Sequence, residues 1–466
     1  MTISAPGLGL TERLADSVLN IDVPQFLNEG TVRDALVDTL AVSAAASNAG
    51  GVHTLRSVTI PEPFDPEALW MGSAAGGPPM AAFLNGTAAH FLDFDDVSPT
   101  MPLHPSAVLV PALLAAAGAG RLPFDRYVEA FNVGQAMFRT IAQALPSPVH
   151  YGRGWHSTAT VGRLAAVAAL ARLERLDVQT TRVALAMAST LASGSRANFG
   201  TMAKPMHAGL AAQDALLAIR WARAGITASV QELEAPTGYF ARFGDTSGTS
   251  LVTFAEDIED RFEFWLNDWA FDWGLKRFPS CYGTHRAIDA ALDLRLDIDG
   301  QSQASGIEGI ERIDVLVHEN GTAPLILDAP GSATEAKFNL EYCVALALLN
   351  GTVELEDFTP ERFATRDDVR ELARKVTLRE QGSEREYATV SISTARGPRL
   401  EAKVLAAKGD SSNPLDAADL KAKVLSCFAY AGHDEARAAK LSAAVDGLAA
   451  DADVMELVTG WTGGAQ

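Results

Sequence analysis

The chain has 466 residues, of which 48% are hydrophobic, and this is enough apolar sequence for a large core and more than one domain. Its formal net charge of −20 argues against nucleic acid and against an anionic membrane surface as partners, because both require a basic face. The 3 cysteines are far apart and form no CxxC pair, which is typical of a protein from a reducing cytosol. No signal peptide or membrane-spanning stretch is visible, so we expect a cytoplasmic protein.

The first half of the sequence predicts helices. Residues 31–48 carry an apolar stripe at helical spacing, whereas residues 53–79 are rich in Gly and Pro and predict a loop. Further helices are expected over residues 80–91, 107–118, 123–144, 157–173, 177–192 and 205–224. Because Ala-rich helices can pack closely, we expect residues 1–268 to form the first part of a large all-helical domain.

The pattern changes after about residue 268. Helical segments over residues 333–350 and 366–375 lie among stretches that alternate apolar and polar residues and predict strands, at 309–317, 386–393 and 399–405. We therefore expect a smaller α+β lid domain over residues 269–405. Residues 406–466 return to a helical pattern and are expected to pack on the first domain, which would then be discontinuous. The predicted fold class is mainly α, with a minor α+β domain.

The stretch from Asn85 to Ser106 has an unusual concentration of titratable residues. It contains two histidines and three aspartates, namely His90, His104, Asp93, Asp95 and Asp96. Acidic residues are rarely buried without a partner, yet these stand among Phe and Leu residues. A metal site is one interpretation, because His and carboxylates are ligands, but HxxDxDD is not a specific metal signature and we assign no metal.

A second pattern places a cation beside the predicted start of a helix at three points. His104, His156 and Lys204 each stand at such a junction, with Ser, Thr or Pro beside them. A helix N-terminus offers free N–H groups and a partial positive charge, so a neighbouring cation is favourable only when an anion binds there. If the three junctions converge, they would bind a di- or tricarboxylate. The alternative is two turn histidines with ordinary hydrogen bonds and a solvated lysine.

Lys276 and His285 bracket a Pro-Ser-Cys turn at the start of the predicted lid. A lysine at this boundary is well placed to close over a substrate bound on the other domain. No histidine can be paired with Cys281 from the sequence, so a structural thiol is favoured over a nucleophile.

Five motifs together resemble the MmgE/PrpD family, over about residues 30–400. They are GTAAHFLDFDD, LHPS, GRGWHSTATVG, ASGSRANFGTMAKPMHAG and KRFPSCYGTHRAIDAAL, in this order. The family includes 2-methylcitrate dehydratases, cis-aconitate decarboxylases and iminodisuccinate epimerases. The resemblance implies a discontinuous helical domain with an α+β lid, a homodimer, and a cofactor-independent site in the cleft between the domains.

The resemblance also implies site residues. Catalytic residues are expected at Asp93, His104, His156, Lys204 and Lys276, and substrate-binding residues at Arg139, Ser157, Thr158, Cys281 and His285. Two positions depart from the decarboxylase pattern, because Val97 stands in place of Thr and Cys281 in place of His. Both departures argue against cis-aconitate decarboxylation.

The shared chemistry is the removal of a proton next to a carboxylate, which fixed cations assist. We expect Lys204, Lys276 and Arg139 to clamp carboxylates. The two histidines would act as acid and base, Asp93 would orient one of them, and Asp95 and Asp96 would hold the loop. The predicted function is a dehydratase- or decarboxylase-type lyase that acts on a small di- or tricarboxylate. The alternatives are an epimerase of such a compound, a non-catalytic carboxylate-binding protein and, more weakly, a metal hydrolase.

Overall fold

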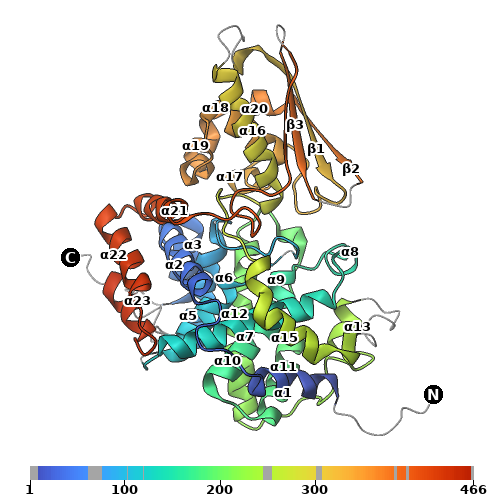
Figure 1. The fold of residues 1–466 in the computed structure, drawn as a ribbon, viewed down its shortest axis with the longest axis vertical. Helices are drawn as coiled ribbons and strands as arrows, with labels where there is room; N and C mark the ends of the chain where they lie inside the picture. The colour runs from blue at the N-terminus through green and yellow to red at the C-terminus, as the bar shows by residue number, and fades with distance from the viewer. Residues whose placement is uncertain are drawn as a thin grey trace.

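The computed structural model describes residues 9–60, 76–101, 103–118, 120–244, 254–300, 307–382, 386–394 and 398–462. The molecule is mainly helical and carries a single four-stranded sheet within these ranges, which confirms the predicted fold class (Figure 1). None of the described helices is both long and apolar enough to cross a membrane.

The helices expected in the first half of the chain are present, with two differences. The segment predicted as one helix over 157–173 is divided into α9 and α10, and part of the predicted loop over 53–79 is helix α3. Residues 61–75 of that loop lie outside the described residues. The elements are α1 (Leu10–Asn20), α2 (Glu29–Ala46), α3 (Gly50–Thr59), α5 (Gly77–Phe91), α6 (Ser106–Ala117), α7 (Phe124–Gln143), α8 (Ser147–His150), α9 (Ser157–Thr160), α10 (Gly162–Glu174), α11 (Val178–Leu191), η1 (Arg196–Asn198), α12 (Ala203–Arg223), α13 (Tyr239–Phe243), α15 (Ile258–Asp268) and η2 (Trp269–Asp272).

Helices α5 and α12 pack against each other through small residues. A Cβ atom on Gly209 would lie 2.1 Å from the carbonyl oxygen of Phe83, and one on Gly86 would lie 2.9 Å from the Cα of Gly209. Only glycine permits this close approach of two backbones. The contact matters for the site because α5 ends beside the acidic loop and the first turn of α12 carries Lys204.

The sheet has the order β2-β1-β3-β4, and β1 pairs with β2 in parallel and with β3 antiparallel. Strands β1, β3 and β4 confirm the three predicted ones, whereas β2 was not predicted. Helices α16 and α18 lie along one face of the sheet (Figure 1). The elements here are α16 (Tyr282–Gly300), η3 (Ile307–Gly309), β1 (Ile310–His318), α17 (Ala333–Ala336), α18 (Leu340–Asn350), η4 (Leu355–Phe358), α19 (Pro360–Thr365), α20 (Asp367–Ala373), β2 (Val376–Gln381), β3 (Ala388–Thr394) and β4 (Leu400–Val404).

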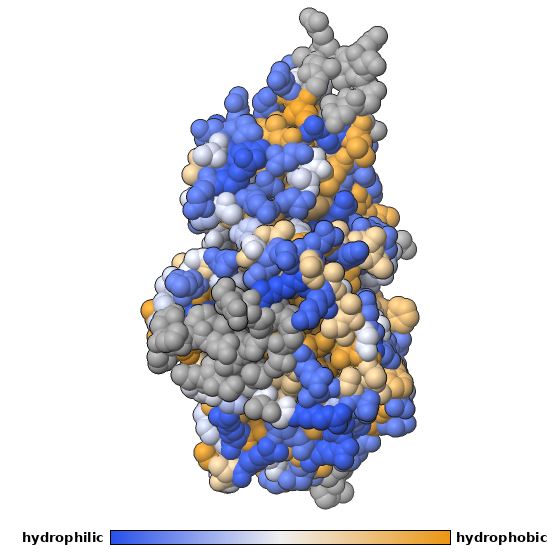
Figure 2. All heavy atoms as spheres, turned by 90° about the vertical axis from the view of Figure 1, so that its left-hand side faces the viewer, coloured by the Kyte–Doolittle hydropathy of each residue, from blue (hydrophilic) through white to orange (hydrophobic). Residues whose placement is uncertain are grey.

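The buried side chains form two separate hydrophobic cores. One belongs to the helical part, within residues 10–275 and 415–458, and is joined by Leu355 of η4, and the other belongs to the α+β part, within residues 278–404. The last helices, α21 (Ala417–Tyr430), α22 (Glu435–Asp446) and α23 (Val454–Thr462), return to the helical part (Figure 1). Figure 2 shows hydrophilic side chains over much of one face of both parts, with hydrophobic ones between them in smaller groups. The exact domain limits at residues 268 and 405 stay a prediction.

Candidate functional site

A cavity of about 440 Å³ lies between the helical part and the α+β part and is lined by residues of both. The five residues predicted to be catalytic all line it, although they come from distant points of the sequence: Asp93, His104, His156, Lys204 and Lys276. The structure therefore brings these residues together, as the hypothesis of converging motifs required.

Asp93 forms the floor of the cavity with two lysines. The Nζ of Lys204 contacts Oδ1 of Asp93, and the Nζ of Lys276 lies 3.1 Å from Oδ2. Burial alone would raise the pKa of Asp93, but the two ammonium groups more than offset this and hold the pKa well below its ordinary value. Asp93 has a left-handed backbone with φ of 56°, which is uncommon for a residue other than Gly or Asn. The trio carries one net positive charge.

Three lysines anchor the backbone of the loop that carries Asp93. Lys337, Lys276 and Lys423 donate to the successive carbonyl oxygens of Leu92, Asp93 and Phe94 at distances of 2.9, 2.9 and 2.7 Å. Each lysine comes from a different region of the chain: the α+β part, its junction with the helical part, and α21. Lys423 also forms a buried ion pair of 2.6 Å with Asp38 of α2.

Asp95, and not Asp93, is the carboxylate that orients the histidines, which corrects the predicted role. Its Oδ2 lies 2.7 Å from Nδ1 of His90 and 3.6 Å from Nδ1 of His104. The Nδ1 of His104 is 2.8 Å from the carbonyl oxygen of Asp96, which can only accept a hydrogen bond. Nδ1 therefore carries the proton, and Nε2 of His104 is the nitrogen that can take one up.

The rings of His104, His90 and His156 form a buried group. The three ring centroids form a triangle, in which His90 lies 4.6 Å from His104 and 5.9 Å from His156, and His104 and His156 lie 6.5 Å apart. Nδ1 of His156 also lies 3.0 Å from Nδ1 of His207, so these two nitrogens share one proton. Burial lowers the pKa of all four histidines, to about 4 for His207. They are neutral at neutral pH and can accept protons.

The helix starts do not form the three converging anion sites that the sequence suggested. The N-terminus of α6 is occupied by Asp96, whose carboxylate accepts from the backbone N–H and the hydroxyl of Ser106. Trp273 Nε1 donates to the same carboxylate at 2.6 Å. Helix α9 has only 4 residues, and Lys204 lies inside the first turn of α12 instead of before it. The positive charge of the cavity therefore comes from side chains.

Four of the five predicted substrate-binding residues do not line the cavity. Arg139 is fully buried and pairs with Asp272 at 3.2 Å, and His285 is buried with Nε2 3.3 Å from the carbonyl oxygen of Ser280. Ser157 is buried at the start of α9, and Thr158 Oγ1 accepts from the backbone N–H of His104. These residues support their neighbours.

Cys281 is the fifth, and it does line the cavity. Burial raises the pKa of its thiol to about 11, so it is protonated at neutral pH and is a poor nucleophile. Val97, the other departure from the decarboxylase pattern, also lines the cavity and pairs through its backbone with Gly274.

Sequence reasoning missed several residues of the site. The cavity lining also includes Tyr151, Arg196, Phe199, Tyr282, Arg286 and His318. Arg196 and Phe199 stand in the motif ASGSRANFG, so the motif itself was the available signal. Lys337 and Lys423 had no such signal, because each makes its contact with a residue more than two hundred positions away.

His90, Asp95 and His104 place potential metal-ligand atoms within 4.8 Å of one another. The Nδ1 atom of His104 donates to a carbonyl, so it has no lone pair for an ion. The Nδ1 of His90 is likewise held by the carboxylate of Asp95. With both Nδ1 atoms committed to hydrogen bonds, only the Nε2 atoms of the two rings keep lone pairs that an ion could use.

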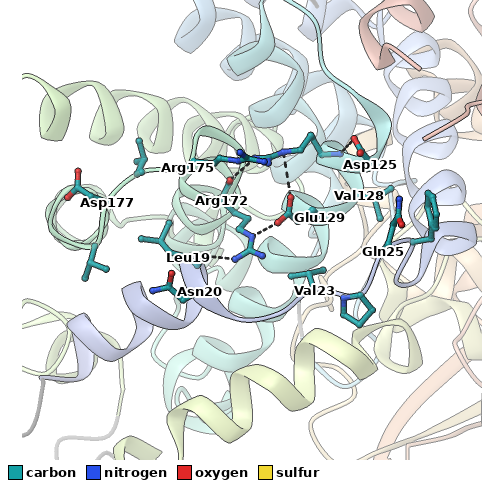
Figure 3. A pocket seen from close by; sticks show the side chains of 15 residues that line it. Leu19, Asn20, Val23, Gln25, Asp125, Val128, Glu129, Arg172, Arg175 and Asp177 are labelled. Atoms are coloured by element: carbon teal, nitrogen blue, oxygen red, sulfur yellow. Dashed lines mark hydrogen bonds and ion pairs between the residues drawn. The ribbon is translucent and has the colours of Figure 1, made fainter. Parts of the chain in front are cut away.

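A larger hollow of about 800 Å³ lies on the helical part, away from these residues (Figure 3). The guanidinium of Arg172 in this hollow already has protein partners. Its Nε lies 2.7 Å from Glu129, and its NH1 donates to the carbonyl oxygen of Leu19. Figure 3 shows these side chains turned toward one another. Arg172 therefore joins α10 to α1 and α7, and the described lining of the hollow holds arginines and carboxylates but neither histidine nor lysine.

The chain is similar in sequence to several known proteins. The sequence matches the MmgE/PrpD N-terminal domain over residues 12–251 and the MmgE/PrpD C-terminal domain over residues 278–447. It is 29% identical over 356 residues to the cis-aconitate decarboxylase of Mus musculus, covering 74% of this chain and 71% of that protein. It is 31% identical over 305 residues to the cis-aconitate decarboxylase of Homo sapiens, covering 65% and 61%. A third relative is the cis-aconitate decarboxylase-like protein oryM of Aspergillus oryzae, 28% identical over 299 residues and 61% of each chain. The two domain matches span most of the sequence, and the chain belongs to the MmgE/PrpD family.

Proposed function

We propose that this protein is a lyase that acts next to a carboxylate of a small di- or tricarboxylate without a cofactor. The observation that carries the proposal is the meeting of Lys204 and Lys276 on Asp93 in a cavity that two neutral histidines also line. Cations held in fixed positions stabilise the negative charge that develops when a proton leaves a carbon next to a carboxylate. The names of the curated relatives support the lyase class.

In the proposed mechanism, Lys204 and Lys276 bind the carboxylate beside the reacting carbon. Asp93 fixes the position of both ammonium groups and balances one of their charges. His104 or His156 removes the proton, because burial keeps the pKa of both rings well below its ordinary value and leaves them unprotonated. The protonated ring would then serve as the acid that assists the leaving group.

Two reactions fit this arrangement within the lyase class. A dehydratase would remove a proton from carbon and lose the neighbouring hydroxyl group, which takes a proton and leaves as water. A decarboxylase would instead break the bond between carbon and a carboxylate, and a protonated histidine would give its proton to the carbon that carbon dioxide leaves. The relatives named decarboxylases favour the second reaction. Val97 and Cys281 in the cavity lining favour the first, because they replace groups expected of decarboxylases with an aliphatic side chain and a protonated thiol.

An isomerase is the second candidate. Two neutral histidines whose ring centroids lie 6.5 Å apart could remove a proton from one face of a carbon and return it to the other. A dicarboxylate with one asymmetric carbon would be the substrate of such an epimerase. A protein that binds carboxylates without chemistry is the remaining alternative.

One experiment separates these reactions. The protein is incubated in heavy water with a panel of hydroxy-, amino- and unsaturated di- and tricarboxylates, and the products are followed by proton NMR. A new olefin signal identifies a dehydratase, release of carbon dioxide a decarboxylase, and deuterium on the carbon next to the carboxylate without net loss an epimerase. Binding without change of any compound would leave the carboxylate-binding protein as the answer. We further propose that the protein is cytoplasmic and forms a homodimer. Measurement of its molecular mass in solution tests the homodimer.

A further inference from the structure

The cations that line the cavity differ in whether an acidic side chain neutralises them. Lys204 and Lys276 share Asp93, and Arg286 lies 2.5 Å from Glu386. Arg196 lines the same cavity, and no carboxylate among the described residues lies within ion-pair distance of it. Its charge is therefore left for something that enters the cavity.

The guanidinium of Arg196 is held in place by neutral groups. It lies over the ring of Tyr151, with Cζ 3.5 Å from the ring centroid, and NH1 donates to the carbonyl oxygen of Tyr151 at 2.6 Å. NH2 donates to the carbonyl oxygen of Ala323 in the α+β part. These contacts use two of the five N–H donors of a guanidinium, and Nε, which has no hydrogen-bond partner in the described part of the chain, is itself buried. The second N–H of NH1 and that of NH2 are the donors left for a ligand. The group is thus fixed in orientation while it keeps free donors.

The charges that line the cavity can be counted from these pairs. Two lysines against Asp93 leave one positive charge at the floor, and Arg196 adds a second, whereas Arg286 is offset by Glu386. The remaining acidic residue of the lining, Glu319, is exposed at the rim, where water screens it. The cavity therefore carries two separate positive centres for a ligand.

We propose that Arg196 binds a second carboxylate of the substrate and so restricts the enzyme to compounds with at least two carboxylates. The inference rests on the proposed function, because it takes the first carboxylate to be the one on Lys204 and Lys276. A planar guanidinium with free donors matches the two oxygens of a carboxylate, and its stacking on Tyr151 reduces the entropy lost on binding. Its bond to Ala323 also links this second carboxylate to the α+β part.

The test compares ligands that differ by one charge. Isothermal titration calorimetry is performed on the full chain with tricarballylate, with glutarate and with glutaramate, in which one carboxylate of glutarate is an amide. We expect the wild type to prefer glutarate over glutaramate by about 10- to 100-fold, the range for one charged hydrogen-bonded contact. Arg196→Gln should remove most of this preference and weaken tricarballylate by a similar factor, while glutaramate binds as before.

A matched control comes from the same region of the chain. Arg153 is exposed, does not line the cavity and donates to the carbonyl oxygen of Gly244, so Arg153→Gln should keep the full preference. Arg196→Lys should keep part of it, because the charge remains but the planar fork is lost. Thermal unfolding of each variant checks that the fold is retained.

The possible results separate this inference from the proposed function. If Arg196→Gln weakens all three ligands equally, or none of them, Arg196 has no role in recognising a second carboxylate. Equal binding of glutarate and glutaramate by the wild type would overturn the inference while the lyase proposal stands. If the wild type neither binds these compounds nor changes any member of the substrate panel, both proposals fail together.

Discussion

Lys337 Nζ donates a hydrogen bond of 2.9 Å to the carbonyl oxygen of Leu92. The donor belongs to the α+β part, and the acceptor directly precedes Asp93 in the helical part. This bond therefore connects the α+β part to the loop that carries Asp93. Burial lowers the pKa of Lys337 to about 8, although the charge of Asp93 opposes the shift. We expect Lys337→Met to leave the Leu92 carbonyl unpaired and to displace Asp93, with a loss of about 10-fold in kcat/KM. Steady-state kinetics beside thermal unfolding measures both effects, and an unchanged kcat/KM would contradict the positioning role.

Lys204 is the most direct test of the proposed chemistry. Lys204→Ala removes the ammonium that contacts Asp93 and, in the proposed mechanism, the developing negative charge. Turnover should fall by about 100- to 1,000-fold, the effect of removing one such stabilising group. Lys421→Ala is the matched control, because Lys421 is an exposed lysine of α21. Near-normal turnover in Lys204→Ala, with the fold intact, would contradict the role of Lys204 in stabilising the developing negative charge.

Asp95 should affect the reaction through the histidines that it contacts. Asp95→Asn replaces the carboxylate beside Nδ1 of His90 with a group that can also donate, so the tautomer of His90 is no longer fixed, and it removes the negative charge that faces His104. We expect a loss of about 100-fold or more in kcat with little change in KM. Kinetics of the variant across pH provides the measurement. A change in KM alone would instead point to a role in substrate binding.

Arg139 should act on stability and not on substrate affinity. Its NH1 lies 2.7 Å from Oε1 of Gln135, and its Nε pairs with Asp272, which in turn accepts from the backbone and hydroxyl of Thr100. Arg139→Met leaves Asp272 buried without its cation, which costs about 3–5 kcal/mol of unfolding free energy. Chemical denaturation measures this loss. A large rise in KM with normal stability would restore Arg139 as a substrate clamp.

The pH dependence of stability can be tested at a histidine outside the cavity. Burial lowers the pKa of His150 from 6.5 to about 4. The folded state then binds fewer protons than the unfolded state between these values, so the contribution of His150 to stability is lost as pH falls from about 6.5 to about 4. Asp96 and Asp38, whose pKa values burial raises to about 7 and about 6, act in the opposite direction.

A comparison of variants isolates the contribution of His150 to the pH dependence of stability. The unfolding midpoint of His150→Gln should fall less than that of the wild type between about pH 7 and about pH 5, whatever its absolute value. The exposed His53 supplies the control, since His53→Gln should follow the wild type. Parallel curves for His150→Gln and the wild type would show that His150 is not held neutral by burial.

Local patterns in the sequence were enough for most of the fold. The apolar spacing of helices such as α2 and α7 and the alternation of β1 are properties of neighbouring residues, and these elements were predicted. Strand β2 was missed because its last three residues, Arg379, Glu380 and Gln381, are exposed and polar, as suits an edge strand. Its place in the sheet depends on parallel pairing with β1, which no local pattern reveals.

The site residues also divide into those that the sequence predicted and contacts that it did not. Residues inside recognisable motifs, such as Asp93, His104 and Lys204, were assigned to one site by a resemblance over about residues 30–400. The partner of each residue was harder to predict: Asp93 pairs with lysines and Asp95 with histidines, although the two aspartates are two positions apart. Lys423 lies 329 residues from the carbonyl that it binds, and such a contact follows only from the folded arrangement of the whole chain.

The anchoring of the acidic loop by three lysines has a consequence for the order of synthesis. His104, His156 and Lys204 are all made within the first half of the chain, and their helices belong to one core. The lysines that bind the carbonyls of Leu92, Asp93 and Phe94 follow at positions 276, 337 and 423. A ribosome must therefore add nearly the whole chain before the loop has its last anchor, even where the first helices fold early. A product truncated at residue 268 would hold the histidines without an assembled site, so premature termination yields an inactive protein.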